Sequence, residues 1–321
     1  MGQLITNPKS YTGEEMAEIF LRASFTGDNA AALGLRVLYN IPVNTTLNFW
    51  KRNENILKTY AAGWTGGAAS TKYQKTLSMA KIKAEQAFEA TDYFGMVFEK
   101  ITNSADANLQ DLSGTDIEKA EVALFRDAIA EDARVTMWVG DTAGTVSTYK
   151  MFDGFIKKAS TYAGSKKFKL TAPTADNVVT SFESALKAAP ATLKAMKSTG
   201  KLAFFVTEDV YEAYQSALDK KDNTLAYSEM QMGRTVLNYH GIEVRSMGVG
   251  SHLKTSQSII ILTHKENLVF AVNTRDLPGA EVSLWYNPDE MENRQRACFL
   301  ATAEILDEDI VVYASTAYSA S

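Results

Sequence analysis

Cysteine is almost absent from the sequence, which contains Cys298 alone. A single cysteine excludes a disulfide within the chain and any C-x-x-C metal or redox motif. Cys298 falls in an alternating, strand-like run, so we expect a small buried side chain at this position. This cysteine usage fits a reducing compartment.

Long hydrophobic runs and an excess of basic residues are also missing. No stretch of about 18 apolar residues occurs, and the first residues lack the basic-then-apolar profile of a signal peptide. The net charge is −5 and the pI is near 5.4, whereas tight phosphate binding needs a dense basic face. We therefore expect a protein of the cytoplasm, without a membrane segment and without a tight grip on nucleic acid.

The signature motifs of common enzymes are lacking as well. The sequence has no G-x-x-x-x-G-K-[ST] loop, no G-x-S-x-G elbow and no H-E-x-x-H. The nearest dinucleotide-like string, residues 248–253, lacks a third glycine and leads to another strand, which predicts a hairpin turn. We expect no catalytic residues, no cofactor and no enzymatic activity. An α/β small-molecule enzyme with an unrecognised site stays the alternative from a different class.

Three histidines, His240, His252 and His264, are evenly spaced at predicted strand ends. A shared zinc ion would need all three strand ends to converge with a fourth ligand or water. Ordinary turns, which collect polar residues, are the simpler interpretation. We therefore expect no metal site.

A long alanine-rich helix is predicted from residue 116 to about 137, because 115–118 has the pattern of a capping box and Gly140 follows as a stop. Asp127, Glu131 and Asp132 lie on this helix. Arg126 and Arg134 are close enough to pair with them, which favours a charged outer face over a catalytic acid–base pair.

The most informative feature present is a hairpin signature over residues 53–84. We expect residues 53–60 to ascend, the glycine-rich tip to hold Trp64, and residues 72–79 to descend. About ten paired residues at about 3.3 Å each span about 30–40 Å, against a radius of gyration of about 20 Å for a globule of this length. This arm should overhang its own subunit.

A bare hairpin is marginally stable in water and invites pairing with other chains. Its natural partner is therefore a neighbouring copy of the same chain. The residues predicted to lie at this interface between subunits are Tyr60, Trp64, Tyr73, Leu77 and Met79.

Beyond the helix, the pattern predicts a compact α/β block followed by an antiparallel sheet. Buried strands are expected in the block at 202–206, 242–247, 258–262 and 268–272. After Pro278, strands are expected in the sheet at 281–286, 294–305 and 310–313. The α/β block is therefore inserted between the long helix and the sheet that packs beneath it.

This order of parts resembles the major capsid protein of tailed bacteriophages, whose HK97-like fold is shared with encapsulin shells. Four stretches of the sequence are similar to motifs common in that family, namely residues 153–156, 203–211, 237–244 and 294–312. The resemblance implies an α+β fold with an N-terminal arm, an extended β-hairpin loop, a peripheral domain of spine helix and antiparallel sheet, and an inserted α/β axial domain. The implied divisions are 1–48 for the arm, 49–88 for the hairpin loop, 89–171 and 277–321 for the peripheral domain, and 172–276 for the axial domain.

The function implied by the resemblance is structural. Many copies would form the pentamers and hexamers of an icosahedral bacteriophage head around double-stranded DNA, which is enclosed without sequence-specific binding. The implied partners are the chain itself, a portal and a separate scaffold or decoration protein, and the implied location is the virion after assembly in the host cytoplasm. The alternative within the same fold is an encapsulin-type nanocompartment shell.

Overall fold

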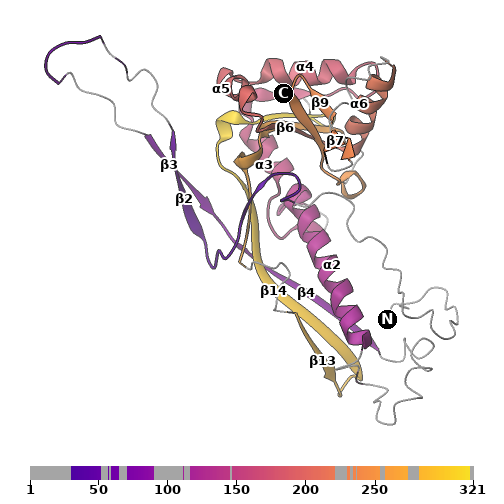
Figure 1. Ribbon diagram of the computed structural model, residues 1–321. Coiled ribbons are helices and arrows are strands. Elements are labelled where there is room, and N and C mark those ends of the chain that lie inside the picture. Colours follow the sequence, from indigo (N-terminus) through magenta and orange to yellow (C-terminus); the bar gives the residue numbers. More distant parts are fainter. Residues whose placement is uncertain are drawn as a thin grey trace.

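The structure is a computed structural model. It describes residues 30–51, 57, 59–64, 71–89, 111, 116–144, 147–220, 230–231, 234–235, 237–253, 257–273 and 282–318. Residues 1–29 of the predicted N-terminal arm and residues 65–70 of the predicted hairpin tip lie outside this description. The described strands form a five-stranded sheet, a six-stranded sheet and two separate strand pairs, and Figure 1 shows a long body with an α/β lobe at one end and a hairpin standing away from both.

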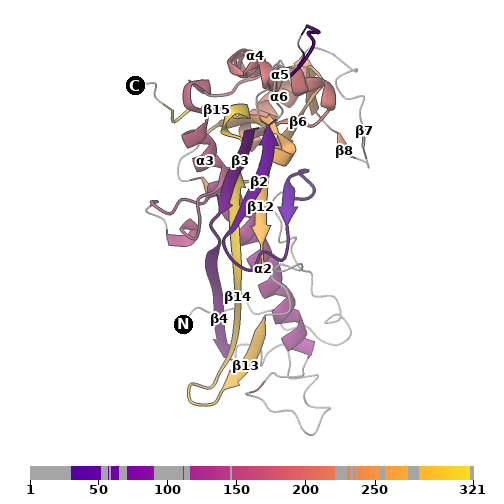
Figure 2. The ribbon, with the colours of Figure 1, turned by 90° about the vertical axis from the view of Figure 1, so that its left-hand side faces the viewer.

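The five-stranded sheet runs along the long body. Its strands are β1 (Arg36–Leu38), β4 (Ala80–Glu89), β12 (Leu268–Val272), β13 (Ser283–Asn287) and β14 (Glu292–Ile305). β14 pairs antiparallel with β13 and β12 along one edge and with β4 along the other, and β1 adds to β12 in parallel. Figure 2 shows β4 and β14 side by side over most of the body.

One face of this sheet packs against α2 (Asp116–Val139). Phe125 and Ile129 of the helix share a core with Ala297 and Phe299 of β14. The predicted long helix is therefore confirmed in position and extends two residues further than expected. It ends where Gly140 hydrogen-bonds back to the Thr136 carbonyl at 2.9 Å.

The six-stranded sheet forms the α/β lobe. In spatial order its strands are β5 (Lys167–Lys169), β15 (Val312–Ser315), β11 (Ile259–His264), β6 (Leu202–Val206), β10 (Ile242–Ser246) and β9 (Leu237–Tyr239). The helices of the lobe and its junction are α3 (Phe155–Tyr162), α4 (Val178–Ala188), α5 (Ala191–Ala195) and α6 (Glu208–Lys220). The remaining short elements are η3 (Ser147–Tyr149), η4 (Gly164–Lys166), η5 (Met196–Thr199), β7 (Met230–Gln231), β8 (Arg234–Thr235), η7 (Gly250–His252), η8 (Lys265–Asn267) and η10 (Glu308–Ile310).

Strand β6 separates two hydrophobic cores. Phe204 faces Phe182 of α4 and Tyr214 of α6, whereas Phe205 faces Trp138 of α2 and the core of the body. Because successive side chains of a strand point to opposite faces, a strand buried on both sides needs an unbroken apolar run, and Leu202–Val206 is buried throughout. The run predicted as a buried strand is confirmed.

Two predicted strands belong to the opposite sheet from the one expected. The strand at 268–272 was expected in the α/β block, but β12 pairs with β14 in the five-stranded sheet. The strand at 310–313 was expected in the antiparallel sheet, but β15 starts at Val312 and pairs with β11 and β5 in the lobe. The chain therefore crosses between the two sheets after β11 and again after β14, so sequence order does not separate them.

Two further local predictions were wrong. Cys298 is exposed, because it lies on the opposite face of β14 from the buried Ala297 and Phe299. Residues 248–253 are not a hairpin turn, since they connect β10 to β11, which lie on either side of β6.

Of the described helices, none has both the length and the apolar character required to span a bilayer.

Candidate assembly interface

The hairpin arm (residues 45–77) consists of β2 (Thr45–Lys51) and β3 (Thr71–Leu77) with the loop that joins them. The two strands pair antiparallel from Thr45 opposite Leu77 to Lys51 opposite Thr71. The predicted hairpin and its descending strand are confirmed, but the ascending strand was placed too late in the sequence. Residues 57 and 59–64, expected at its end and at the tip, are not strand.

The described part of the loop carries large apolar side chains that are almost fully exposed. Trp64 and Tyr60 are each 93% exposed, and Leu57 is 92% exposed. In Figure 1 this stretch lies at the far end of the arm, away from the body. Large aromatic side chains are the residue types that contribute most binding energy at protein interfaces. Their exposure here indicates a surface that another molecule covers.

The other three predicted interface residues lie nearer the base of the arm. Tyr73 is 38% exposed and Met79 is half-buried. Leu77 is fully buried, so its side chain is covered by its own subunit and offers no surface to another copy. We therefore correct the expectation for Leu77, while the interface role of Tyr60, Trp64, Tyr73 and Met79 stays a prediction.

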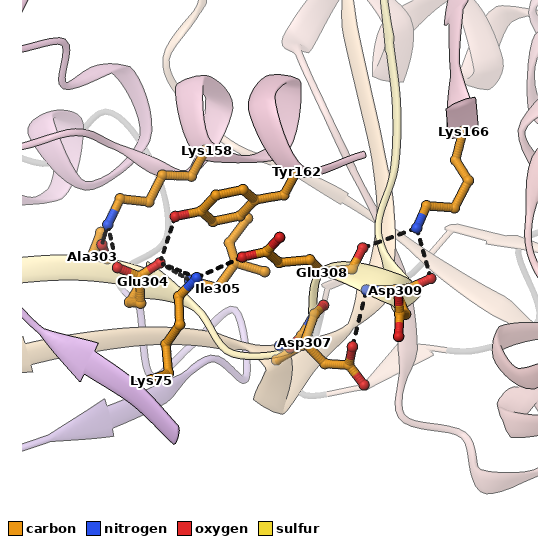
Figure 3. Close-up of polar contacts among 11 residues, drawn as sticks. Lys75, Lys158, Tyr162, Lys166, Ala303, Glu304, Ile305, Asp307, Glu308 and Asp309 are labelled. Atoms are coloured by element: carbon orange, nitrogen blue, oxygen red, sulfur yellow. Dashed lines mark hydrogen bonds and ion pairs between the residues drawn. The ribbon is translucent and has the colours of Figure 1, made fainter. Parts of the chain in front are cut away.

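At its base the arm contacts the body through charged groups, which we call the arm-base cluster (Lys75, Lys158, Tyr162, Glu304 and Glu308; Figure 3). Lys75 Nζ of β3 lies 2.7 Å from Glu308 Oε1 and 3.7 Å from Glu304 Oε1. The same ammonium lies 4.2 Å from the centre of the Tyr162 ring, a cation–π distance. Glu304 is also held by Lys158 Nζ at 2.6 Å.

The electrostatics of this cluster favour the charged form of Lys75. Burial alone would lower the pKa of this ammonium, but the hydrogen bond to Glu308 and the nearby Glu304 carboxylate outweigh it, so the pKa lies above its ordinary value. For Tyr162, burial and then the negative charge of Glu304 raise the pKa of the phenol. The hydrogen bond and the nearby charge therefore hold Lys75 in its charged form and in contact with Glu308.

Sequence reasoning missed this cluster. Glu308 lies between the predicted strands 294–305 and 310–313, and 233 positions separate it from Lys75. No local pattern marks such a pair. Only the pairing of β4 with β14, which brings the base of the arm beside the end of β14, places the two residues together.

The long helix contacts the lobe through Arg134, which forms an ion pair within α2 and hydrogen bonds to backbone carbonyls after β10. The buried Arg134 guanidinium binds Glu131 in a bidentate manner, with Nε to Oε2 at 2.7 Å and Nη2 to Oε1 at 2.8 Å. It also donates to the carbonyl oxygens of Met247 at 3.1 Å and Gly248 at 2.8 Å. The expected pairing of Arg134 with the acidic residues is confirmed for Glu131, but it lies inside the molecule and not on a charged outer face.

The three histidines do not come together. His252 shares a hydrogen bond with the Tyr149 hydroxyl at 2.9 Å, His264 accepts one from the Glu266 amide, and His240 lies against the Tyr239 ring. In the part of the chain that the structure describes, no three His, Cys, Asp or Glu side chains are arranged to hold a metal ion.

A groove of about 440 Å³ lies between α2 and β4. Its lining is mostly apolar and includes Ile82, Phe125 and Phe299, with Asp132 at one side. Burial, followed by the charge of Glu131, raises the pKa of Asp132. Glu85 also lines the groove. A raised carboxyl pKa is not enough to define a catalytic site, because a nucleophile or a second acid–base group must also lie within hydrogen-bond reach of the reacting atoms.

Comparison with solved structures identifies the fold as that of capsid-type shell proteins. A chain of the native GTA particle capsid aligns over 99% of this chain and 97% of its own length, with a TM-score of 0.54 and 13% identity. A chain of the satellite phage P4 procapsid, solved with its size determination protein, aligns over 90% and 95%, with a TM-score of 0.53 and 9% identity.

An encapsulin shares the fold too. A chain of the holo-SrpI encapsulin complex from Synechococcus elongatus PCC 7942 aligns over 87% of this chain and 84% of its own, with a TM-score of 0.51 and 10% identity. The sequence itself matches no protein-family model and no curated protein. The expected resemblance is therefore confirmed at the level of fold: the chain has the mixed α+β, HK97-like architecture of bacteriophage capsid proteins.

Proposed function

We propose that this chain is the major capsid protein of a tailed bacteriophage and that many copies assemble into the pentamers and hexamers of an icosahedral head. The observation that carries the proposal is the hairpin arm, whose tip keeps Tyr60 and Trp64 93% exposed away from the body. Such a tip gains stability only when another surface covers it. Because the solved structures that share the fold are capsids, we infer that the covering surface belongs to a second copy of the chain.

In this proposal α2 and the five-stranded sheet are the peripheral domain, and the α/β lobe is the axial domain at the centre of each capsomer. The arm reaches over the adjacent subunit. The shell encloses double-stranded DNA without sequence-specific contacts, and a net charge of −5 suits a wall that must not hold its genome strongly. Its further partners are a portal and a separate scaffold or decoration protein, and its final location is the virion, after assembly in the host cytoplasm.

Electron microscopy of the expressed protein tests the proposal. We expect closed, regular particles, formed either alone or with a scaffold protein. Deletion of residues 61–70 should leave soluble, folded subunits that do not assemble, since none of the described residues of the loop belongs to either hydrophobic core. A monomer at every concentration, with scaffold present, would refute shell formation, and normal particles from the deletion would refute the role of the tip.

The encapsulin match favours one alternative, a nanocompartment shell that encloses a cargo protein in place of DNA. The contents of purified particles separate the two functions. Nuclease-protected DNA in particles from the native source supports the bacteriophage head, whereas a co-purifying cargo enzyme supports the nanocompartment.

A further inference from the structure

The direction of the hairpin arm is not set by a continuous sheet. β2 and β3 form a strand pair of their own, and pairing stops at Leu77. After Ser78 and Met79 the chain starts to pair again at Ala80, now with β14 of the body. Within this link the Met79 amide donates to Asn44 Oδ1 at 2.7 Å, a bond between the two sides of the arm's own base. A link of two residues outside both ladders therefore still has backbone dihedrals that can change the angle of the arm relative to the body.

Lys75 spans this link. It lies on the arm, two residues before pairing stops, and its ammonium binds Glu308 at 2.7 Å, beyond the end of β14. The lysine side chain is 19% exposed, and the Glu304 side chain nearby is 7% exposed. The Lys75–Glu304 pair, at 3.7 Å, is therefore shielded from water and is screened less by salt than the closer Lys75–Glu308 pair, whose glutamate is 49% exposed.

One of the two carboxylates that Lys75 contacts, Glu304, is itself held by three further groups. Glu304 binds Lys158 of α3 at 2.6 Å and accepts from the Ile305 amide at 3.1 Å, while Tyr162 of α3 donates to it at 3.4 Å. Figure 3 shows Glu304 of β14 and Glu308 of the following turn facing the Lys75 ammonium, with Lys158 and Tyr162 of α3 on the other side of Glu304. A fixed acceptor restricts the donor to one position.

We propose that Lys75 is a positioning residue that fixes the direction of the hairpin arm relative to the body, through Glu304 and Glu308. The arm then presents Trp64 in one orientation to the next copy, a consequence that rests on the proposed shell function. The proposal that Lys75 fixes the arm does not rest on the shell function, because every contact in the arm-base cluster lies within one subunit.

Removal of the lysine charge should free the arm without unfolding the body. Glu304 keeps Lys158 as its partner, and Glu308 is 49% exposed, so water replaces the lost ammonium there. Lys75→Met retains most of the apolar stem and loses only the charge. Glu308→Gln is a second variant that weakens the same contact at an exposed position, should the first fold poorly.

The chain offers a direct measurement of arm direction. Cys298 is its single cysteine and is exposed on β14, and Ala62 is exposed near the tip. Spin labels at Cys298 and at Ala62→Cys report the distance between body and tip by pulsed electron paramagnetic resonance. An excess of unlabelled subunits of the same variant restricts the signal to distances within one subunit. Lys201→Met, which breaks an exposed pair with Glu266 in the lobe, is the matched control.

We expect a narrow distance distribution for the parent and for Lys201→Met. For Lys75→Met we expect loss of this narrow peak and a broad distribution in its place, with a smaller broadening for Glu308→Gln. An unchanged narrow peak in both Lys75→Met and Glu308→Gln would overturn the proposal.

Particle formation by the same samples keeps the two proposals distinct. If the peak broadens in Lys75→Met but the parent forms no shells, the positioning role stands and the proposed function fails. If the parent forms shells but the peak does not change, the positioning role fails and the proposed function stands.

Discussion

The Gly154 amide donates a hydrogen bond of 2.8 Å to the carbonyl oxygen of Gly140, and it joins the end of α2 to the start of α3. Neither residue has room for a side chain. A Cβ atom on Gly154 would lie 2.5 Å from the Trp138 carbonyl oxygen, and one on Gly140 would overlap the Phe152 carbonyl oxygen. The backbones of the two elements are therefore in direct contact. We infer that this turn sets the angle between α2 and α3.

Gly154→Ala should destabilise the subunit through steric overlap alone. The φ of Gly154 is −80°, which alanine adopts freely, but the obstructing atoms are backbone and cannot rotate away. We expect a loss of about 2–3 kcal/mol in the free energy of unfolding, at the upper end of overpacking costs. Denaturant titration of the subunit measures it.

The control for this substitution is Gly164→Ala. Gly164 has a φ of +52° and nothing within 4 Å of a Cβ atom, so the cost there is the left-handed conformation, about 1 kcal/mol. An equal or smaller loss for Gly154→Ala would show that the α2–α3 turn relaxes easily and does not set the geometry of the junction.

Arg134→Met should cost about 3–5 kcal/mol, because it leaves the Glu131 carboxylate and two carbonyl groups without their buried donor. Arg134→Lys should recover only part of this, since an ammonium cannot reproduce a bidentate fork. The measurement is the free energy of unfolding. Arg126→Met, at an exposed position of the same helix, should change it by less than about 0.5 kcal/mol. Equal losses at positions 126 and 134 would contradict the stabilising role of the buried pair.

The long helix and the buried strand β6 were predictable because their signals are local. A capping pattern, an apolar period and a following glycine lie within one stretch for α2, and an uninterrupted apolar run marks Leu202–Val206. The tip glycines predicted that a hairpin exists, but not how many residues its loop contains. The ascending strand is instead 45–51, where Thr45, Thr46, Phe49 and Trp50 supply the β-branched and aromatic residues that strands favour.

Other errors come from choices that only tertiary packing makes. Alternation in β14 predicts that Cys298 points away from Ala297 and Phe299, but not which side α2 covers. The sheet membership of β12 and β15 depends on two crossovers between sheets. For the same reason the ion pair between Lys75 and Glu308 has no signature in the sequence, since it joins the base of the arm to a turn at the other end of the chain.

Acid should weaken the contact between the lobe and β1 through Glu243. Glu243 Oε2 binds Lys265 and Arg245, each at 2.8 Å, and Arg245 also reaches the Ala32 carbonyl before β1. Burial alone would raise the pKa of Glu243, but the hydrogen bonds from Lys265 and Arg245 outweigh it and lower the pKa below its ordinary value of 4.5. A carboxylate with a lowered folded-state pKa stabilises the fold above the unfolded-state pKa, and this contribution is lost as the pH falls through the folded-state pKa.

Glu243→Gln should therefore be less stable than the parent at pH 7, by about 1–2 kcal/mol, and the difference should vanish as the pH falls well below 4.5. Thermal melting across a pH series measures it. The control is Glu85→Gln, which removes an exposed pair with Lys83 and should leave the curve unchanged. A difference that stays constant from neutral to acidic pH would refute the ionic origin of the effect.

Alanine at Trp64 should separate assembly from folding. The side chain is 93% exposed and belongs to neither core, so its removal should change the free energy of unfolding by less than about 0.5 kcal/mol. At an interface, a buried tryptophan anchor contributes about 2 kcal/mol or more, which is about a thirtyfold change in an association constant. We expect Trp64→Ala to raise the protein concentration at which particles form by about that factor.

Thr59→Ala is the matched control, since Thr59 is an exposed residue of the same loop without a large apolar surface. It should leave the threshold for particle formation unchanged, as judged by light scattering and electron microscopy. Because Tyr60 is as exposed as Trp64, Tyr60→Ala should raise the threshold too, and the double variant should reveal whether the two side chains enter one surface. Particles that form at the parental threshold in the double variant would contradict the assignment of the tip as an intersubunit contact. In that case the two aromatic side chains would stay exposed to water in the finished shell, and their removal would cost no binding free energy.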